Sequence, residues 1–532
     1  MTMIKRTVIL LWCCVPMFLG CTSERNVLNI TDFGAVADGV TDNAGAINAA
    51  VAECCGKGGG TVVVPAGRFV SGTVYLKGGV TLKLAKGAEL VASPELCAYG
   101  HYETDRDMSR YDTGVGTGNQ NCVSDTVWTK ALIIARNADG ASIKGPGTID
   151  GGNLRNPEGE EGMRGPHTVI VAESGNFRMS DLKIRNASNY AVLCYEIRNC
   201  RFDDLTITGG WDGIHIRGGK DIRIDDCRFE TGDDCVAGGY WKNMDISDCS
   251  LNSSCNGLRM IMPSEGLHIC DCRFFGPGKY PHVTRGARCD MLNAIFLEPG
   301  GWGEAPGVLS DIRVEDCSFD SVLSPFCVTL KDGHHCKDIT IEGCRATACR
   351  MALSVKSWES ATTDRVRIIG SSFSFDGNPE PGLGKRISAL PFSQWPDFPS
   401  YGAYFRNVGS LDLEDTDFTV TSADTREAVV RNEPAKSSSP DFFLLKSTNM
   451  RTKKCAVFAE CCTFFCAMCY ICKNYHGYGR FAQYIPHKAL ACPDGLFPQF
   501  PRTNQLEQPA HLHHGAERRR QVHDDSAAYQ KI

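Results

Sequence analysis

A short repeat constrains the fold of this chain more than any other feature. Segments with alternating β-branched residues recur along the chain, each followed by Asp, Asn or Gly. Six of them carry a cysteine in a similar context: Cys200, Cys227, Cys249, Cys272, Cys317 and Cys344. These cysteines are 27, 22, 23, 45 and 27 residues apart, and we interpret the 45 as about two repeats. Ser371 and Thr416 continue the series, so the chain is expected to form a solenoid.

The repeat predicts an all-β solenoid. No helical segment separates successive strands, which excludes βαβ units and favours strands stacked coil upon coil. We therefore predict a right-handed parallel β-helix over residues 32–445. The 28 cysteines of a secreted chain could form disulfides, but the six patterned ones are expected to act as small hydrophobic residues in one core column.

The N-terminal end of such a solenoid needs a cap, because an open strand edge invites aggregation. Asp42 is a suitable N-cap for a helix that runs to about Cys55. Ala46, Ile47, Ala50, Val51 and Cys54 would share its apolar face. Three glycines then end the helix, and the first strands follow from Thr61.

The first residues have the pattern of an export signal. Lys5 and Arg6 precede a short apolar run that ends in Leu19-Gly20-Cys21, which resembles a bacterial lipobox. This predicts a signal peptide over 1–20, lipid on Cys21, a tether over 21–31 and an outer-membrane lipoprotein at the periplasmic or cell surface. A plain signal peptide with a chance cysteine is the alternative.

The C-terminal stretch departs from the repeat. Over residues 446–532 the alternation and the turn spacing stop, and cysteine-rich and basic runs take their place. A metal-binding or membrane-associated appendage is one interpretation. We favour a disordered or non-native tail, because the stretch has no fold-forming period.

The net charge of the chain bears on whether it binds nucleic acid. The formal net charge is −6 at pH 7, without the basic stripe expected of a nucleic-acid-binding protein. We therefore expect no nucleic-acid partner. A local basic cleft for an anionic sugar is compatible with this balance.

Three residues at intervals of 22 indicate a site. Asp212, Asp234 and Asn256 are each one repeat apart, and Asp233 lies beside Asp234. Equivalent positions on neighbouring coils are roughly 4.8 Å apart. Carboxylates at that range repel each other, so a purely structural role is a poor explanation and a functional one is favoured.

Several motifs resemble a known enzyme family. DFGAVADGVTDN with the following GGGTVVVPAG resembles the start of the pectate-lyase-like β-helix superfamily. KGPGTIDGGN, WDGIHI and ETGDDCVAG narrow the resemblance to glycoside hydrolase family 28, the polygalacturonases. The resemblance implies inverting acid–base hydrolysis of a pectic, uronate-containing polysaccharide. It assigns Asp233 as general acid and Asp212 with Asp234 as the water-activating pair, and we expect a monomer without metal or cofactor.

The sequence departs from that family in one stretch. Asn256 stands where the family usually has a histidine, and the usual Arg-Ile-Lys motif is missing. Arg259, His282 and Arg285 are the candidate substrate-binding residues together with Asn256, because arginine suits carboxylates. A divergent specificity within pectin is therefore expected.

Two other functions remain open from the sequence. A calcium-dependent polysaccharide lyase on the same fold would use the aspartates as ligands and Arg259 as base. A non-catalytic glycan-binding β-helix is the third candidate. The fold alone does not choose between these three functions.

Overall fold

A computed structural model describes residues 26–112, 121–286, 288–301, 303–358, 360–388 and 397–432. All of them lie in the first of two compact units, Met1–Ser438. Cys21, the signal peptide and the C-terminal stretch fall outside the described residues, so the predictions made for them stay predictions. No helix among the described residues is long and apolar enough to span a membrane.

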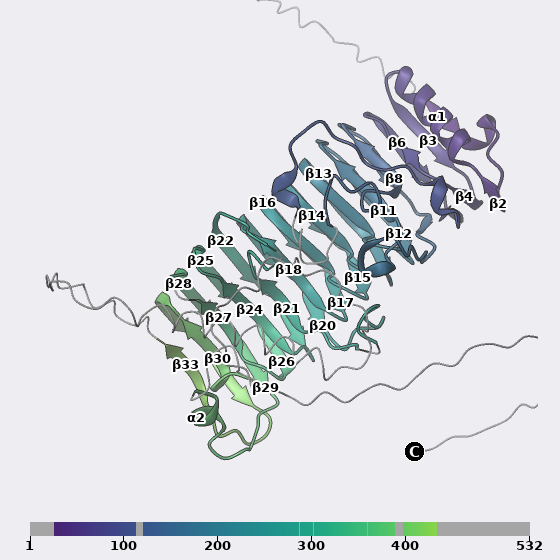
Figure 1. Ribbon diagram of the computed structural model, residues 1–532. Coiled ribbons are helices and arrows are strands. Elements are labelled where there is room, and N and C mark those ends of the chain that lie inside the picture. Colours follow the sequence, from purple (N-terminus) through teal and green to yellow (C-terminus); the bar gives the residue numbers. More distant parts are fainter. Residues whose placement is uncertain are drawn as a thin grey trace, which may run out of the picture. The chain divides into compact units, whose positions relative to one another are not determined.

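The described chain is a right-handed parallel β-helix in which three stacks of parallel strands enclose one core (Figure 1). The first stack contains β1 (Val27–Asn29), β3 (Gly60–Val64), β6 (Val80–Leu84), β9 (Ser142–Lys144), β12 (Arg178–Arg185), β13 (Val192–Thr208), β14 (Ile214–Asp225), β16 (Val236–Ser247), β19 (Glu265–Cys270), β22 (Val308–Glu315), β25 (His335–Glu342), β28 (Thr362–Ile369) and β31 (Val408–Glu414).

The second stack continues from the C-terminal parts of β12 and β13. Its other strands are β2 (Asp38–Asp42), β4 (Gly67–Ser71), β7 (Ala88–Ala92), β10 (Thr148–Asp150), β15 (Arg228–Thr231), β17 (Ser250–Ser253), β20 (Arg273–Phe275), β23 (Ser318–Asp320), β26 (Arg345–Cys349), β29 (Ser372–Phe375) and β32 (Asp417–Val420).

The third stack includes the first residues of β13, β14 and β16. Its other strands are β5 (Val74–Tyr75), β8 (Ala131–Arg136), β11 (His167–Ala172), β18 (Asn256–Met262), β21 (Asn293–Leu297), β24 (Ser324–Leu330), β27 (Leu353–Ser357), β30 (Ser400–Arg406) and β33 (Glu427–Asn432). Short helices are α2 (Leu383–Ser388) and the 3₁₀ turns Ile30–Phe33, Leu96–Ala98, Ser109–Tyr111 and Glu160–Gly162.

Alternation along each strand explains why the stacks form. In β14, Ile222 and Ile224 are fully buried in the core, whereas Arg223 between them points outward and is exposed. The same inward positions on the next coil are Met244 and Ile246. Inward residues therefore stack on their equivalents, which buries a continuous apolar column along the helix.

The predicted capping helix is confirmed as α1 (Ala44–Gly56). Its buried residues are Ile47, Ala50, Val51 and Cys54, and Ala46 packs against the same core. Asp42 Oδ1 accepts hydrogen bonds from the backbone N–H groups of Ala44 and Gly72, both at 2.9 Å. The fold begins earlier than predicted: β1 pairs with β3 and so lies inside the segment expected to be a tether.

The cysteine column is confirmed with one correction. Five cysteines, from Cys227 to Cys344, occupy equivalent positions just before β15, β17, β20, β23 and β26, and Ser371 and Thr416 continue this column. Cys200 was wrongly included. It is paired with Ile222 instead, and Leu205 holds the column position on that coil. The 27 residues between Cys200 and Cys227 are therefore not one repeat, because the two cysteines occupy different positions of their coils.

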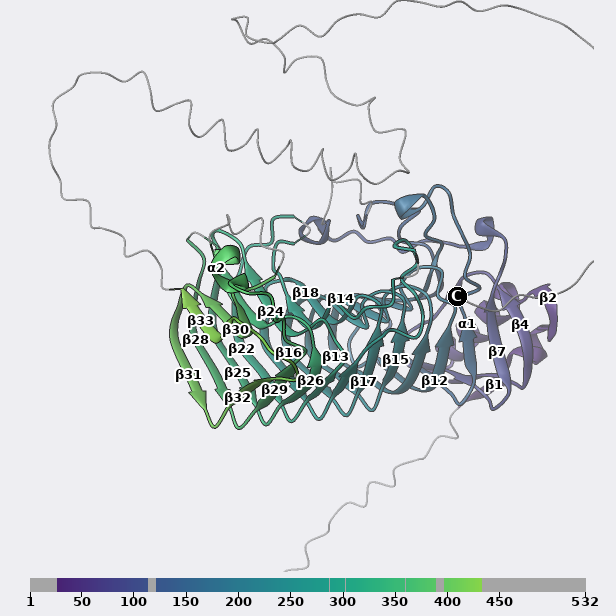
Figure 2. The ribbon, with the colours of Figure 1, turned by 90° about the horizontal axis from the view of Figure 1, so that it is seen from below.

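The interpretation of the 45-residue interval was also wrong. β20 pairs directly with β23, so Cys272 and Cys317 lie on adjacent coils. The additional residues form two insertions in one coil, one on each side of β21. Figure 2 shows the loops of this part of the chain on the side of the solenoid that carries β14 and β18. The first insertion, residues 276–292, contributes directly to the site.

Candidate functional site

The site lies where three successive coils turn from the second stack into the third. Gly213 N donates to Asp234 O at 2.9 Å, and Cys235 N donates to Asn256 O at 3.0 Å. These bonds place Asp212, Asp234 and Asn256 in one row, as the 22-residue spacing predicted. The row arises because each turn follows a strand of the second stack in the same register.

A cavity of about 260 Å³ opens beside this row. Asp212, Asp233 and Asp234 line it, and one oxygen from each lies within 4.8 Å of the others. Of the residues predicted to bind substrate, Arg259, His282 and Arg285 also line the cavity. Asn256 does not line the cavity, but its side-chain amide donates a hydrogen bond to Asp234.

Asp212, just before β14, contacts a chain of buried polar groups on that strand. His215 Nδ1 lies 2.8 Å from Asp212 Oδ2, and Arg217 Nε donates to His215 Nε2 at 3.2 Å. Because Nε2 accepts that bond, the imidazole is neutral and its proton is on Nδ1, where it is donated to Asp212. The ring stacks on Tyr190 with centroids 4.5 Å apart, which fixes its orientation.

Asp234 is held by an amide on one side and faces a cation on the other. Its Oδ1 accepts hydrogen bonds from Asn256 Nδ2 at 2.8 Å and from Asn256 N at 3.1 Å. Asn293 Nδ2 donates to Asn256 Oδ1 at 3.0 Å, which orients that amide. Arg259 Nη1 lies 3.9 Å from Asp234 Oδ2, and the same guanidinium forms an ion pair with Glu298.

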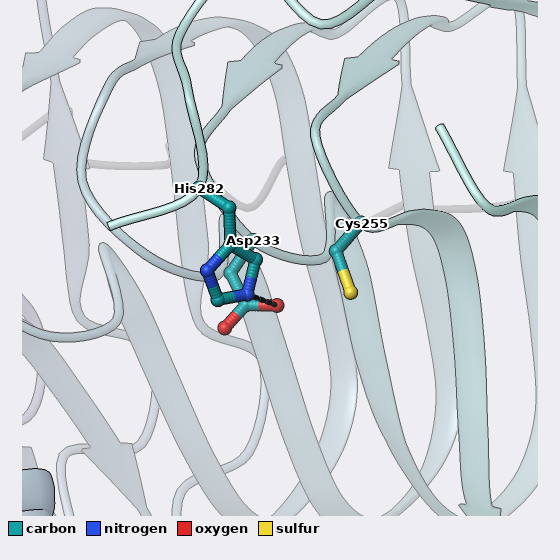
Figure 3. A group of neighbouring side chains, drawn as sticks. All are labelled: Asp233, Cys255 and His282. Carbon is teal, nitrogen blue, oxygen red and sulfur yellow. Dashed lines mark ion pairs between the residues drawn. The ribbon is translucent and has the colours of Figure 1, made fainter. Parts of the chain in front are cut away.

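Asp233 has a histidine and an arginine as neighbours. His282 Nε2 lies 3.6 Å from Asp233 Oδ1, and Arg164 Nη2 lies 3.8 Å from Asp233 Oδ2. Figure 3 shows the imidazole over this carboxylate, with the Cys255 side chain nearby. Thr284 N donates to His282 Nδ1 at 3.2 Å, so the ring proton is on Nε2 and faces Asp233.

The three aspartates therefore titrate differently. Burial, followed by repulsion from Asp233 and Asp234, raises the pKa of Asp212 well above its usual value. Burial and then the Asp233 charge raise the pKa of Asp234 to about 6. Burial opposes ionisation of Asp233 too, but His282 and Arg164 outweigh it and lower that pKa to about 2. Below a pH of about 6, the cavity thus holds one charged and two protonated carboxyl groups.

The first insertion is anchored to β17 by Asn252. Asn252 Nδ2 donates to the carbonyls of Phe275 and Pro277 at 2.8 and 2.9 Å, and its Oδ1 accepts from Lys279 N at 2.7 Å. Within the insertion, His282 N donates to Arg288 O at 3.0 Å. These bonds hold His282 over the aspartates although it is distant from them in sequence.

Two groups of side chains have the donor atoms of a metal site. They are the three aspartates and the set Asp233, Cys255 and His282, each with atoms within 4.8 Å. The second set matches the oxygen, sulfur and nitrogen ligands of zinc. Its geometry, however, directs the Nε2 proton of His282 at Asp233, and a metal ligand needs that lone pair free. Arg164 and Arg259 also face the same carboxylates and compete with a cation.

Sequence reasoning missed several residues of the cavity wall. His215 and Arg217 alternate outward on the strand that begins just after Asp212, so strand alternation was a signal that could have found them. Arg164 and Glu160 lie in the 151–166 connection before β11. No repeat marks that connection, and the KGPGTIDGGN motif ends at Asn153, before both residues.

Comparisons with known proteins agree with this geometry. Residues 61–257 match the model of glycosyl hydrolases family 28. A probable polygalacturonase of Vitis vinifera is 30% identical over 222 residues, which cover 39% of this chain and 43% of that protein. An exopolygalacturonase of Platanus acerifolia is 25% identical over 322 residues, covering 58% of this chain and 75% of the relative.

A solved structure has the same fold. The exopolygalacturonase from Thermotoga maritima superposes with a TM-score of 0.53 at 17% identity, over 73% of this chain and 92% of that one. At this identity the likeness concerns the fold. The match to glycosyl hydrolases family 28, residues 61–257, covers the segment that carries Asp212, Asp233 and Asp234.

Proposed function

We propose that this protein hydrolyses glycosidic bonds in a pectic, uronate-containing polysaccharide. The observation that carries the proposal is the row of aspartates from adjacent coils, which share one cavity and have different pKa values. Hydrolysis needs one carboxyl group that keeps its proton and one that is ionised. The match to glycosyl hydrolases family 28 covers this row and supports the substrate class.

In the proposed reaction, a carboxylic acid protonates the leaving glycosidic oxygen as the bond to the anomeric carbon breaks. A carboxylate takes a proton from the water that attacks this carbon. The family resemblance gives the first role to Asp233 and the second to Asp212 or Asp234. His282 and Arg164 would then steady Asp233 after it has given up its proton.

The electrostatics of the empty cavity favour a second assignment. Asp233 is ionised there, with a pKa of about 2, whereas Asp234 keeps its proton up to a pH of about 6. On this basis Asp234 is the proton donor and Asp233 the base. Substitution of each residue by Asn distinguishes the two assignments, since Asn preserves the shape and removes the titration.

We also propose inversion of the anomeric configuration. Inverting enzymes separate their two carboxyl groups by roughly 6.5–9.5 Å, and retaining enzymes by about 5 Å. The resemblance to glycosyl hydrolases family 28 supports inversion, whereas the nearest oxygens of the three aspartates, within 4.8 Å of one another, are closer than expected for an inverting pair. Proton NMR of the first product formed checks the proposal: the inverted anomer is expected, and the retained anomer would contradict it.

The test of function uses defined galacturonate oligosaccharides, with and without a chelator. A hydrolase releases new reducing ends without ultraviolet absorbance, and its activity is unchanged by the chelator. A lyase product absorbs through its new double bond and calcium is required. A glycan-binding protein releases nothing.

The roles are then read from variants. Asp233→Asn and Asp234→Asn should each lower kcat by roughly 10²–10⁴, the usual contribution of acid–base catalysis. An aryl galacturonide with a good leaving group should restore activity in the variant that lacks the proton donor, because that substrate needs less protonation. Full activity of both variants on oligosaccharides would reject the mechanism.

We further propose that the protein is exported and held at the outer membrane by lipid on Cys21. The support is the lipobox-like Leu19-Gly20-Cys21 after a short apolar run. It would act as a monomer on a polysaccharide, with no nucleic-acid partner, no metal and no cofactor.

A further inference from the structure

The arginines around the cavity differ in what already neutralises them. Arg164 forms ion pairs with Glu160, Glu161 and Asp233, at distances of 3.3–3.8 Å. Arg259 is paired with Glu298 and lies near Asp234. The positive charges of these two arginines are therefore largely neutralised by carboxylates of the protein, and they attract an anionic ligand only weakly.

Arg217 is a different case. It lines the cavity from β14 and is 0% exposed. Its partners are His215 Nε2 at 3.2 Å and the carbonyl oxygens of Tyr111 and Asn121, at 2.9 and 3.0 Å from Nη1. Within the described residues, no carboxylate pairs with Arg217, and no hydrogen bond uses its Nη2.

Such a buried cation is costly. Removing a guanidinium from water without a paired anion costs several kcal/mol, and neutral acceptors compensate only part of it. An anion that enters the cavity would supply the missing charge. Of the five N–H groups of Arg217, its hydrogen bonds use three, and the two on Nη2 remain to donate to the oxygens of a carboxylate.

We propose that Arg217 is the anchor for the carboxylate of a uronate sugar in the cavity, and so sets the specificity of the enzyme for acidic over esterified or neutral sugars. The inference rests on the proposed function. It assigns this role to a residue on β14 in place of Arg259 or Arg285. Arg259 is engaged with Glu298, and Arg285 is exposed at the insertion.

The surroundings of Arg217 hold its guanidinium in one orientation. Two carbonyls fix Nη1 and the His215 ring fixes Nε, so little rotational freedom remains to be lost on binding. The same His215 contacts Asp212 at 2.8 Å. Arg217 would therefore connect the bound sugar to Asp212 through the imidazole ring of His215.

The first experiment measures binding without catalysis. Calorimetry with galacturonic acid and with galactose is carried out on the parent protein, Arg217→Gln and Arg217→Lys. The parent should prefer the acid by roughly 10–100-fold, which corresponds to one charge-assisted interaction. Arg217→Gln should abolish this preference, and Arg217→Lys should keep part of it.

Arg313→Gln is the matched control, since Arg313 is exposed on β22 and is paired only with the neighbouring Asp311 among described residues. It should bind galacturonic acid as the parent does. Thermal unfolding shows whether each variant is folded, and galacturonic acid should raise the melting temperature of the parent and of Arg313→Gln but not of Arg217→Gln.

The second experiment measures kcat/KM for a galacturonate trisaccharide and its methyl ester. Arg217→Gln should lower the value for the acid at least 10-fold more than the value for the ester, mainly through KM. An equal loss for both substrates, or a parent that binds galactose as tightly as galacturonic acid, would overturn the assignment. If the parent binds the acid through Arg217 but cleaves neither substrate, the proposed hydrolysis fails and the anchor stands.

Discussion

At the residue scale, Asp233 and Asp234 are neighbours in sequence with opposite surroundings. Asp233 faces His282 and Arg164, whereas Asp234 receives its hydrogen bonds from Asn256 and lies beside the Asp233 charge. Both side chains line one cavity because they lie in a turn, where successive side chains need not point to opposite sides as they do in a strand. This arrangement creates a difference in proton affinity within a single dipeptide, which acid–base catalysis can use.

Asp234→Asn should therefore stabilise the protein at pH 8. The pKa of Asp234 in the folded state, about 6, exceeds the ordinary value of 3.8, so stability falls as the pH rises through this window. The variant removes a penalty of up to roughly 3 kcal/mol. Its melting temperature should exceed that of the parent at pH 8 and approach it at pH 4.

The control for that measurement is Asp245→Asn, because Asp245 is half-exposed on β16, outside the cavity. It should show no comparable gain at pH 8. A gain for Asp234→Asn that is equal at both pH values would contradict the electrostatic explanation and indicate better packing instead.

Prediction from sequence at this scale succeeded where residues follow the coil period. Asp212 and Asp234 were found because 22 residues return the chain to the same position, and hydrogen bonds between adjacent turns depend on that period. Arg164 is brought to the site by a connection of irregular length, so no spacing in the sequence reports it. His282 was a candidate for its charge, but its contact with Asp233 depends on how the insertion folds back.

At the scale of elements, the insertion between β20 and β21 behaves as part of the site. Asn252 is 1% exposed and makes three hydrogen bonds to its backbone. The insertion places His282 on Asp233. Catalysis should therefore be sensitive to an anchor that does not itself line the cavity.

Asn252→Ala is expected to lower both activity and stability. It leaves two partly buried carbonyls and one N–H without their partner, a loss of about 2–4 kcal/mol. The acidic limb of the pH profile of kcat/KM should also move, because His282 would no longer be held against Asp233. Chemical denaturation and pH-dependent kinetics measure the two effects.

Asn378→Ala is the control for this prediction, because its Oδ1 accepts one exposed hydrogen bond, from Glu380 N at 3.1 Å, outside the cavity. It should change the free energy of unfolding by less than about 1 kcal/mol and leave the pH profile in place. An Asn252→Ala protein with a parental pH profile would show that the insertion holds His282 without this anchor.

The insertion also explains why element boundaries were mispredicted in this region. A 45-residue interval equals two coils in length, and length alone does not distinguish two short coils from one coil with long loops. Because β20 and β23 pair directly, the interval is one coil with long loops. Cys200 misled for a related reason: it has the same strand-like neighbours as the true column but lies at another position of its coil.

At the scale of the whole molecule, the fold was predictable because the strands and turns recur at regular intervals in the sequence. The stacks need alternate apolar residues and turns at regular intervals, and both are visible without a structure. The cap could be predicted too, since α1 has one apolar face and begins beside Asp42. The start at β1 was missed because three residues are too few to show a pattern.

The export prediction is tested on the full chain. Cys21→Ser should move the protein from the membrane fraction to the soluble fraction, because a Ser at this position cannot carry the thioether-linked lipid. Metabolic labelling with a palmitate analogue should mark the parent and leave Cys21→Ser unlabelled. A parental fractionation and label in the variant would refute the lipid anchor.

The coil-by-coil origin of the aspartate row has a consequence for how such proteins diversify. Three consecutive coils each supply one member of the row, Asp212, Asp234 and Asn256, and no other coil in the described part of the chain supplies one. Gain or loss of a complete coil beyond this trio, and beyond the coils that carry Arg164 and the 276–292 insertion, would lengthen or shorten the platform for the proposed polymer and leave the site in place. Gain of one coil inside the trio would separate two partners by a further 4.8 Å or so and silence the chemistry. If the proposed function holds, the length of polysaccharide that the protein contacts and its ability to cleave it would thus vary independently in this architecture.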